Sequence, residues 1–240
     1  MKKYFVSKNR IYRGFECLTG ALCGILFACT SNGSDTVIVP SAPASTIIAA
    51  AIPDSIQTKM ENYIPIYEGS TPPVITGTYV ISPEKLVYAT DDISTLTSFN
   101  DTYIRFSDQN TTTNRAVYDE RQGTSTAHSD DVLVIGSGNN FTAYFVSTGT
   151  SSGIYVKTTT VISGTKTTSG ISGLRYAFVM VDKGADPNDT LVAVGTFRVF
   201  KDNDGLAANA VWPTALLLKT RAASALSNKS RSFLSSERIQ

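Results

Sequence analysis

The chain has 240 residues and a formal net charge of +1, and charged residues make up 17% of it. This length suits one domain with appendages, large enough to bury about 70% of its unfolded surface. A nearly neutral chain lacks the positive excess that general nucleic-acid binding requires, so we expect no nucleic-acid partner. All three cysteines lie within the first 29 residues, so we expect a domain without disulfides that depends on its core.

The N-terminal residues have the pattern of a secretory signal peptide. Five Lys and Arg residues come first, and an apolar run from Cys17 to Ala28 follows. This run is too short to span about 30 Å of hydrocarbon, as a transmembrane helix must. We therefore predict a signal peptide over residues 1–28. Its removal would leave 212 residues with a net charge of −3, because the leader holds five basic residues and one Glu.

The end of this leader, Leu26-Phe27-Ala28-Cys29, resembles the bacterial lipobox, in which an aliphatic and a small residue precede the Cys that defines the motif. The resemblance implies cleavage after Ala28 and lipid on Cys29, which would anchor the protein to a membrane. The alternative is an ordinary leader in which Cys29 is incidental. Residues 29–52 are then the lipidated Cys and a tether rich in Ser, Thr, Pro and Ala. No second long apolar run follows, so we expect no further membrane crossing by the polypeptide.

A short helix is predicted next. Pro53-Asp54-Ser55 has a carboxylate and a proline where a helix N-terminus prefers them. Apolar residues then follow at helical spacing and form one face: Ile56, Met60, Tyr63 and Ile64. Pro65 and the turn sequence EGSTPP end the helix.

After Pro73 the pattern changes to that of β-strands. Nine runs are rich in β-branched and aromatic residues, and most are bounded by turn residues: Val74–Ile81, Lys85–Thr90, Thr102–Phe106, Ala116–Arg121, Val132–Ile135, Phe141–Ser147, Ile154–Ser163, Leu174–Val181 and Leu191–Phe200. Alternation in two runs separates Phe141, Ala143 and Phe145 from Tyr144, and Tyr176 from Val179. No run between them predicts a crossover helix. We therefore predict an all-β domain over residues 53–213, a single antiparallel barrel of eight to nine strands, with a β-sandwich as the alternative.

The last part of the chain is predicted to be a tail. The sequence KDNDG marks a turn after the final strand run, and Trp212 and Pro213 follow it. Residues 214–240 are rich in Ala, Leu, Ser, Lys and Arg. The pattern is compatible with a helix over Thr214–Leu226 and predicts disorder from Ser227 onward.

The start of the barrel is similar to that of lipocalin-like (calycin) barrels. There a small helix precedes a strand that carries G-x-W, and here Ile75-Thr76-Gly77-Thr78-Tyr79 has Tyr79 in place of the Trp. The resemblance implies that Tyr79 plugs the closed end of the barrel and that Gly77 allows close approach of the chain. It also implies an Arg over the aromatic ring, for which Arg198 is the candidate. Trp212 is a further structural candidate.

More of the chain looks like uncharacterised outer-membrane lipoproteins of Bacteroidetes. The lipobox is followed by the Ser/Thr tether, by IPDSIQTKMENYIPIYEGSTPPVITGTYVISP and later by GTFRVFKDNDG. The resemblance covers most of Ile52 to Trp212. It implies a lipid anchor in the outer membrane, facing the periplasm or the cell surface, and implies no activity.

Motifs that carry chemistry are sparse. The single histidine, His128, precedes Asp130 and Asp131, and a polar hairpin tip is favoured over a metal cluster because no second His or Cys is near. Gly149–Gly153 matches the nucleophile elbow, but it joins two strands and is predicted to be a turn. Gly136–Gly138 and Asp202–Gly205 are likewise predicted to be turns. We predict no catalytic residues, no metal and no cofactor.

Aromatic side chains are the remaining functional signal. Tyrosines on the strand runs either fill the core, which is the default for a barrel of this size, or line a ligand cavity. Tyr144, Tyr155 and Tyr176 are the ligand-binding candidates. The leading hypothesis is a non-enzymatic, lipid-anchored envelope protein whose barrel binds a small apolar or amphipathic molecule or a glycan. The alternatives are a structural or accessory subunit docked on a larger outer-membrane complex and, more weakly, a carboxylate-dependent hydrolase.

Overall fold

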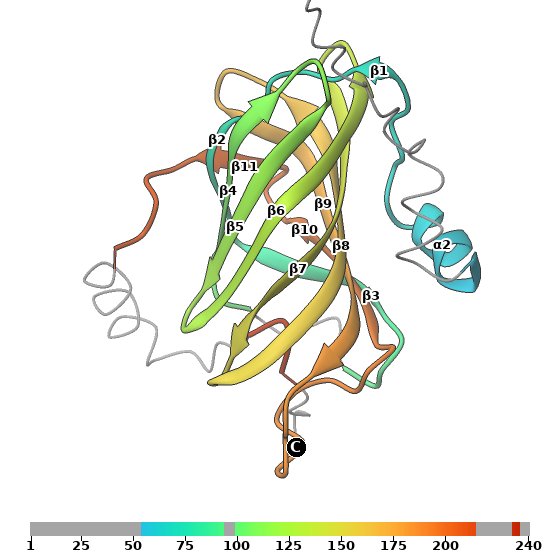
Figure 1. Ribbon diagram of the computed structural model, residues 1–240, viewed down its shortest axis with the longest axis vertical. Coiled ribbons are helices and arrows are strands. Elements are labelled where there is room, and N and C mark those ends of the chain that lie inside the picture. The colour runs from blue at the N-terminus through green and yellow to red at the C-terminus, as the bar shows by residue number, and fades with distance from the viewer. Residues whose placement is uncertain (1–53, 94–98, 215–231, 236–240) are drawn as a thin grey trace, which may run out of the picture. The chain divides into compact units, whose positions relative to one another are not determined.

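One sheet of eleven strands, with a helix on its outside, forms the domain (Figure 1). The structure is a computed structural model that describes residues 54–93, 99–214 and 232–235. The helix is α2 (Asp54–Glu61), and the strands are β1 (Ser70–Thr71), β2 (Gly77–Ile81), β3 (Glu84–Ala89), β4 (Thr102–Asn110), β5 (Arg115–Gln122), β6 (Ser125–Ser137), β7 (Asn140–Ser151), β8 (Ile154–Lys166), β9 (Gly170–Lys183), β10 (Phe197–Asp202) and β11 (Leu206–Asn209). All pairings are antiparallel except that of β1 with β6.

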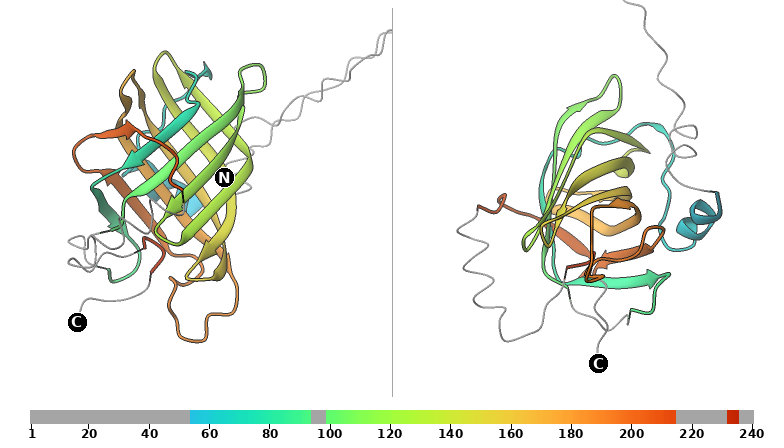
Figure 2. Two further views of the ribbon diagram at one scale, coloured as in Figure 1. Left: turned by 90° about the vertical axis from the view of Figure 1, so that its left-hand side faces the viewer. Right: turned by 60° about the horizontal axis from the view of Figure 1, so that its bottom comes forward.

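Eight of the strands close into a ring, in the order β11-β2-β4-β5-β6-β7-β8-β9 and back to β11. The ring is uneven because β9 pairs with two different strands along the edge that does not pair with β8. Its residues Gly170–Ser172 pair with β11, and Arg175–Val179 pair with β10, which in turn pairs with β3. Figure 2 shows the strands curving around a shared interior. This arrangement confirms the predicted single antiparallel barrel.

Successive side chains on the strands alternate between the interior and the outer surface, as predicted. On β7, Phe141, Ala143 and Phe145 belong to the interior core, whereas Tyr144 belongs to a separate cluster on the outside. Tyr176 on β9 faces the interior, as Phe141 does. The interior is therefore built mainly from aromatic and branched side chains, which point into it from every strand of the ring.

Helix α2 confirms the predicted short helix, and its apolar side lies on the outer surface of the sheet. Met60 in the helix and Ile64 just after it are buried in one cluster with Tyr144 and other outer-face residues. Tyr63 stacks on Tyr88 of β3, with ring centroids 4.2 Å apart. Burying apolar side chains of this size stabilises the contact by roughly 1.5–3 kcal/mol each, which explains why the segment covers this part of the barrel.

Two strands and one loop differ from the prediction. The short strands β1 and β11 were not predicted, and β11 has the sequence Leu-Ala-Ala-Asn, which lacks β-branched residues. The run Leu191–Phe200 is a strand only from Phe197 onward. Gly195, with φ of 88°, makes the turn that interrupts it, because this left-handed conformation suits glycine.

Tyr79 is fully buried in the interior, and burial raises its pKa to about 12. Gly77 has φ of 150°, and a Cβ at this position would lie 3.0 Å from the Tyr79 hydroxyl, so the glycine leaves room for the ring. The cation over that ring is Lys166, whose Nζ lies 5.3 Å from its centroid. The expectation that Arg198 lies over Tyr79 is wrong, because Arg198 points into the interior from β10 and binds the C-terminal residues described below.

The predictions for both ends of the chain are tested only in part. The signal peptide, Cys29 and the tether through residue 52 lie outside the described residues, as does most of the predicted helix over Thr214–Leu226. Within the described ranges, no helix has the length and apolar character needed to cross a membrane. The prediction of disorder from Ser227 onward is wrong for Ser232–Ser235, where Phe233 and Leu234 are only 2% and 4% exposed.

Candidate ligand site inside the barrel

Two buried glutamates, Glu84 on β3 and Glu120 on β5, face the interior of the barrel. The inner side of β5 carries Glu120 together with Tyr118 and Gln122, and all three side chains are buried. Carboxyl groups are costly to bury unless hydrogen bonds compensate for the lost water. Their surroundings therefore decide their protonation and what they can bind.

Glu84 uses only one of its two oxygens. Its Oε2 accepts hydrogen bonds from Thr102 Oγ1 at 2.7 Å and from Gln122 Nε2 at 2.6 Å. Its Oε1 is buried and has no hydrogen-bond partner among the described residues. Burial, together with the nearby charge of Glu120, raises the pKa of Glu84 to about 8, although the hydrogen bond from Thr102 opposes this. At neutral pH this carboxyl is mostly protonated and able both to donate and to accept a hydrogen bond.

Glu120 is held by two tyrosines. The hydroxyls of Tyr118 and Tyr176 both donate to its Oε2, at 2.5 and 2.9 Å. Burial raises the pKa of Glu120 to about 7 against the effect of these hydrogen bonds. Burial, and the neighbouring Glu120, also raise the pKa of each tyrosine well above its ordinary value. Glu120 therefore titrates near neutrality, while both tyrosines stay protonated.

Aromatic rings lie directly beside this polar group. Tyr176, whose hydroxyl binds Glu120, has its ring 5.5 Å from Phe233, centroid to centroid. Phe178 and Phe200 lie 5.3 and 5.9 Å from the same Phe233 ring, and Phe99 packs edge-on against Phe200 at 5.1 Å. The interior at this end thus combines hydrogen-bonding groups with apolar rings, as ligand sites in proteins do.

The C-terminal residues Ser232–Ser235 enter the same region. The Phe233 main-chain nitrogen donates to Gln122 Oε1 at 2.8 Å, so one Gln122 side chain binds both Glu84 and the C-terminal segment. Arg198, fully buried, donates to the carbonyl of Phe233. The C-terminal segment therefore meets strands β3 and β5 at the glutamates and the aromatic rings.

Of the three predicted ligand-binding tyrosines, only Tyr176 lies in this region. Tyr144 faces the outer surface beneath α2, and Tyr155 is 45% exposed on β8. The three side chains therefore do not form one site. The prediction missed Glu84, Glu120 and Gln122, and it named Arg198 only as the candidate cation over the Tyr79 ring. One signal in the sequence was available. Because side chains on a strand alternate with a period of two residues, three hydrogen-bonding side chains of this run share one face, and they are Tyr118, Glu120 and Gln122.

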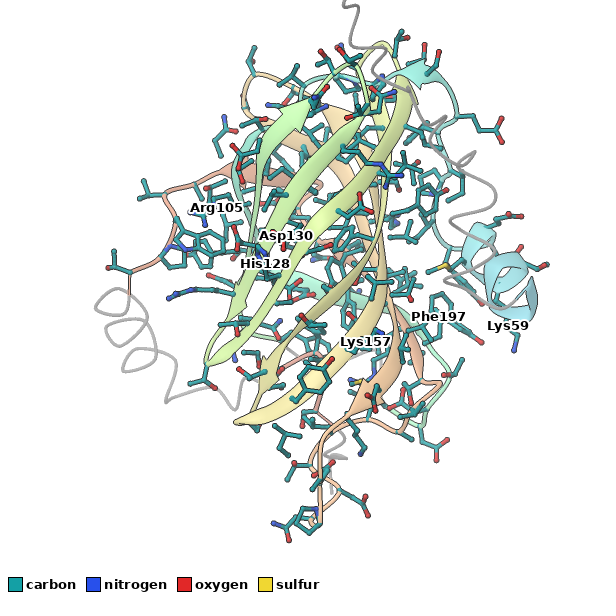
Figure 3. The ribbon with its side chains drawn as sticks, in the orientation of Figure 1. Lys59, Arg105, His128, Asp130, Lys157 and Phe197 are labelled. Carbon is teal, nitrogen blue, oxygen red and sulfur yellow. The ribbon has the colours of Figure 1, made fainter. Side chains whose placement is uncertain are left out.

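His128 lies within strand β6, so the predicted hairpin tip is wrong (Figure 3). Its Nδ1 lies 2.9 Å from Asp119 Oδ1, and its Nε2 lies 2.9 Å from Asp130 Oδ1. These hydrogen bonds raise the pKa of His128. Asp131 binds Arg115 instead. Across residues 54–93, 99–214 and 232–235, no group of three or more His, Cys, Asp or Glu side chains has the arrangement of a metal site.

The outer face beside His128 carries a row of charged side chains. Arg105, Asp119 and His128 stand opposite one another on β4, β5 and β6, and Arg105 Nη2 binds Asp119 Oδ2 at 2.7 Å. The Trp212 ring packs under Arg105, whose Cζ lies 4.4 Å from its centroid, and Arg121 is 5.8 Å away. Cation–π contacts of this kind stabilise the chain where it leaves β11, which is a structural role for Trp212.

The other predicted turns are confirmed only in part, because Gly149, Thr150 and Ser151 belong to strand β7, and Gly136 and Ser137 belong to strand β6. Ser152 and Gly153, both with positive φ, connect β7 to β8. Residues Gly138 and Asn139 connect β6 to β7, and Asp202 caps the turn to β11 by accepting a hydrogen bond from the Asp204 nitrogen at 3.1 Å.

Fold and site together define an all-β, barrel-like protein with a buried polar and aromatic cluster inside its sheet. No protein-family model, no curated protein and no solved structure matches this chain.

Proposed function

We propose that this protein is a lipid-anchored binding protein of the bacterial cell envelope, and that its barrel holds a small amphipathic ligand at the cluster around Glu84 and Glu120. The signal-peptide pattern and the lipobox at Cys29 support the anchor. A lipocalin-like barrel is part of the proposal. The buried Tyr79, the close approach at Gly77 and the Lys166 cation over the Tyr79 ring support it.

The observation that carries the binding proposal is the unpaired Oε1 of Glu84. A buried polar atom without a hydrogen-bond partner costs about 1–3 kcal/mol, and such atoms are rare in folded proteins. A ligand hydroxyl or amide would supply the missing partner. The aromatic rings of Phe178 and Phe200 would contact the apolar part of the same molecule. The site therefore favours a ligand with a neutral polar group on an apolar body.

Glu84→Met tests the binding site, because methionine keeps the volume of the side chain and removes both oxygens. The protein would be purified from native membranes, and native mass spectrometry would compare wild type, Glu84→Met and Glu68→Gln. Glu68 is an exposed carboxylate outside the barrel and serves as the control. We expect a small-molecule adduct in wild type and Glu68→Gln that is reduced at least about tenfold in Glu84→Met, as the loss of about 1.4 kcal/mol would cause. No adduct in wild type, with no binding of an added apolar fluorophore, would overturn the proposal.

The same preparation tests the anchor. Intact mass should show diacylglycerol on a chain that begins at Cys29, and Cys29→Ser should move the protein into the soluble fraction. An unmodified Cys29 in a full-length soluble chain would refute the anchor without bearing on the ligand site.

A docking role is a second candidate, because apolar side chains are exposed on three neighbouring strands. Val146 on β7, Tyr155 on β8 and Val181 on β9 are 38%, 45% and 39% exposed. A partner protein on this face would bury them. Val146→Asp should then abolish co-purification of that partner and leave ligand binding intact.

A further inference from the structure

The two oxygens of the Glu84 carboxyl have different surroundings. Oε2 lies 2.7 Å from Thr102 Oγ1 and 2.6 Å from Gln122 Nε2, whereas the buried Oε1 has no hydrogen-bond partner among the described residues. A neutral carboxyl carries its proton on one oxygen, and that oxygen is the donor. The hydrogen bonds around Oε2 therefore decide whether Oε1 offers a ligand a donor or an acceptor.

A series of hydrogen bonds that starts at the backbone fixes these directions. The Phe233 main-chain nitrogen can only donate, and its acceptor is Gln122 Oε1 at 2.8 Å. The same amide therefore turns its donor, Nε2, toward Glu84 Oε2 and toward Thr102 Oγ1, which lies 2.8 Å away. Because Thr102 Oγ1 accepts from Gln122, its own proton points to Glu84 Oε2. Oε2 thus accepts from two donors, and a proton on this carboxyl belongs to Oε1.

The groups around Glu84 keep the carboxyl neutral. Its side chain is buried, and the charges of Glu120 on β5 and Asp101 just before β4 both act against its ionisation. Asp202, its cross-strand partner on β10, is another buried carboxyl. Burial among acidic groups disfavours the charged form, and the pKa of Glu84 rises to about 8. Two further hydroxyls in this cluster donate to Glu120 and stay protonated, those of Tyr118 and Tyr176.

We infer that the ligand carries a hydrogen-bond acceptor, such as the carbonyl oxygen of a ketone or an ester, which binds the proton on Glu84 Oε1, and that the site releases this ligand as pH rises. The inference rests on the proposed function, and it adds the chemical class of the ligand and the regulation of its binding. A ligand whose polar group only donates would bring two donors together. Loss of the proton turns Oε1 into a charged acceptor, which repels a carbonyl oxygen.

The test compares three probes of similar size on the full-length protein. Methyl hexyl ketone only accepts hydrogen bonds, octylammonium only donates them, and octane does neither. Their affinities would be measured by displacement of bound Nile red, a neutral apolar fluorophore. At pH 7 we expect the ketone to bind at least about tenfold more tightly than either of the other probes. Its affinity should fall about tenfold between pH 7 and pH 9, as the proton of Glu84 is lost.

Glu84→Gln separates the donor from the charge. Its amide oxygen accepts from Thr102 and Gln122 in place of Oε2, and its NH₂ group takes the place of the protonated Oε1. We therefore expect this variant to keep the preference for the ketone and to bind it equally from pH 7 to pH 9. Glu84→Met should lose the preference and still bind octane. Glu68→Gln, at an exposed position, is the control and should behave as wild type.

The results distinguish this inference from the proposed function. A preference for octylammonium, equal affinity for all three probes, or loss of the ketone preference in Glu84→Gln would overturn the inference and leave the proposed function standing. A fall in ketone affinity with pH that persists in Glu84→Gln would assign the titration to another group and overturn the pH dependence. If neither Nile red nor any probe binds wild type, both proposals fail. Glu84→Gln keeps the test decisive if Glu84→Met does not fold.

Discussion

Gln122 accepts a hydrogen bond from the main-chain nitrogen of Phe233, a residue 111 positions further along the chain, at 2.8 Å. The nitrogen of the same amide donates to Glu84 at 2.6 Å. One side chain on β5 thus joins the start of β3 to the C-terminal segment. The buried carboxyl and the end of the chain are therefore parts of one hydrogen-bonded cluster, and a change in either should affect the other.

The protonation of Glu84 should make the stability of the protein depend on pH. Its pKa is about 8 in the folded protein against an ordinary value of 4.5, so the folded protein binds this proton more tightly than the unfolded chain. The stabilisation is complete below 4.5 and is lost as pH rises toward 8. Each such proton contributes a slope of up to about 1.4 kcal/mol per pH unit.

Glu84→Gln should flatten this dependence, because glutamine keeps an oxygen to accept from Thr102 and does not titrate. Urea unfolding between about pH 5 and pH 8.5 would measure it, and the difference between variant and wild type isolates the contribution of Glu84. Glu68→Gln should keep the wild-type slope. If the free energy of unfolding of Glu84→Gln changes with pH in parallel with that of wild type, the buried carboxyl is ionised throughout this pH range and the prediction is wrong.

Arg198→Met should destabilise the protein strongly, by about 3–5 kcal/mol, because it leaves Asp91 and two carbonyls without their buried partner. Arg115→Met is the matched control. Arg115 pairs with Asp131, which is mostly exposed, and surface pairs of this kind contribute about 0–1 kcal/mol. Chemical denaturation compares the two variants. Equal losses of unfolding free energy in the two variants would mean that the buried contacts of Arg198 stabilise the protein no more than a surface ion pair does.

His128 should titrate above its ordinary pKa of 6.5, because Asp119 and Asp130 accept hydrogen bonds from its ring. A histidine whose pKa is raised on folding stabilises the protein below 6.5 and loses that effect as pH rises through the folded pKa. The side chain is 48% exposed, so solvent keeps the effect on stability small.

NMR titration of the imidazole is simple here, since the chain has one histidine. Asp119→Asn should move the pKa of His128 downward, because it removes the first of the two carboxylates. Asp131→Asn should leave it unchanged, as Asp131 binds Arg115. A shift of the same size in both variants would contradict the assigned contacts.

Gly149→Ala should destabilise the β6–β7 pairing. A Cβ at this position would lie 1.8 Å from the Thr126 carbonyl oxygen, so the backbone would have to move. Overpacking of this kind costs about 1–3 kcal/mol. Gly184→Ala is the control, because its Cβ would meet its nearest neighbours at 3.5 Å, an ordinary contact. Thermal unfolding of both variants measures the difference, and similar midpoints would show that the sheet tolerates the methyl group.

Local pattern predicted most of the sheet. Runs of β-branched and aromatic residues between turn residues located a strand at each of the nine predicted positions, although Leu191–Phe200 is a strand only from Phe197. Alternation on β7 separated Phe141 from Tyr144 correctly. It worked because the pleat makes adjacent residues face opposite sides, whatever the strand pairs with. Strand β11 was missed because its sequence Leu-Ala-Ala-Asn has no strand preference, and it becomes a strand only by pairing with β2 and β9.

Tyr176 is the only residue of the candidate ligand site that the sequence prediction named as ligand-binding. Glu84 is the first residue of β3 and lies between a proline and a lysine in the sequence, so nothing local distinguishes it from a surface carboxylate. Phe233 lies in a polar stretch that predicts disorder, and it is ordered by rings on β9 and β10. These residues acquire their environment from partners far away in the chain.

The sequence by itself determined nine of the eleven strands, the inner and outer faces of two of them and the short helix, because periods of 2 and 3.6 residues are properties of neighbouring positions. It also holds the basis of the proposed membrane anchor at Cys29. Only the tertiary structure decided how β9 and β11 close the ring, which glutamates are buried, and where the C-terminal segment lies. Each of these depends on residues roughly 35 to 111 positions apart meeting in the buried interior, where an unpaired polar group is costly.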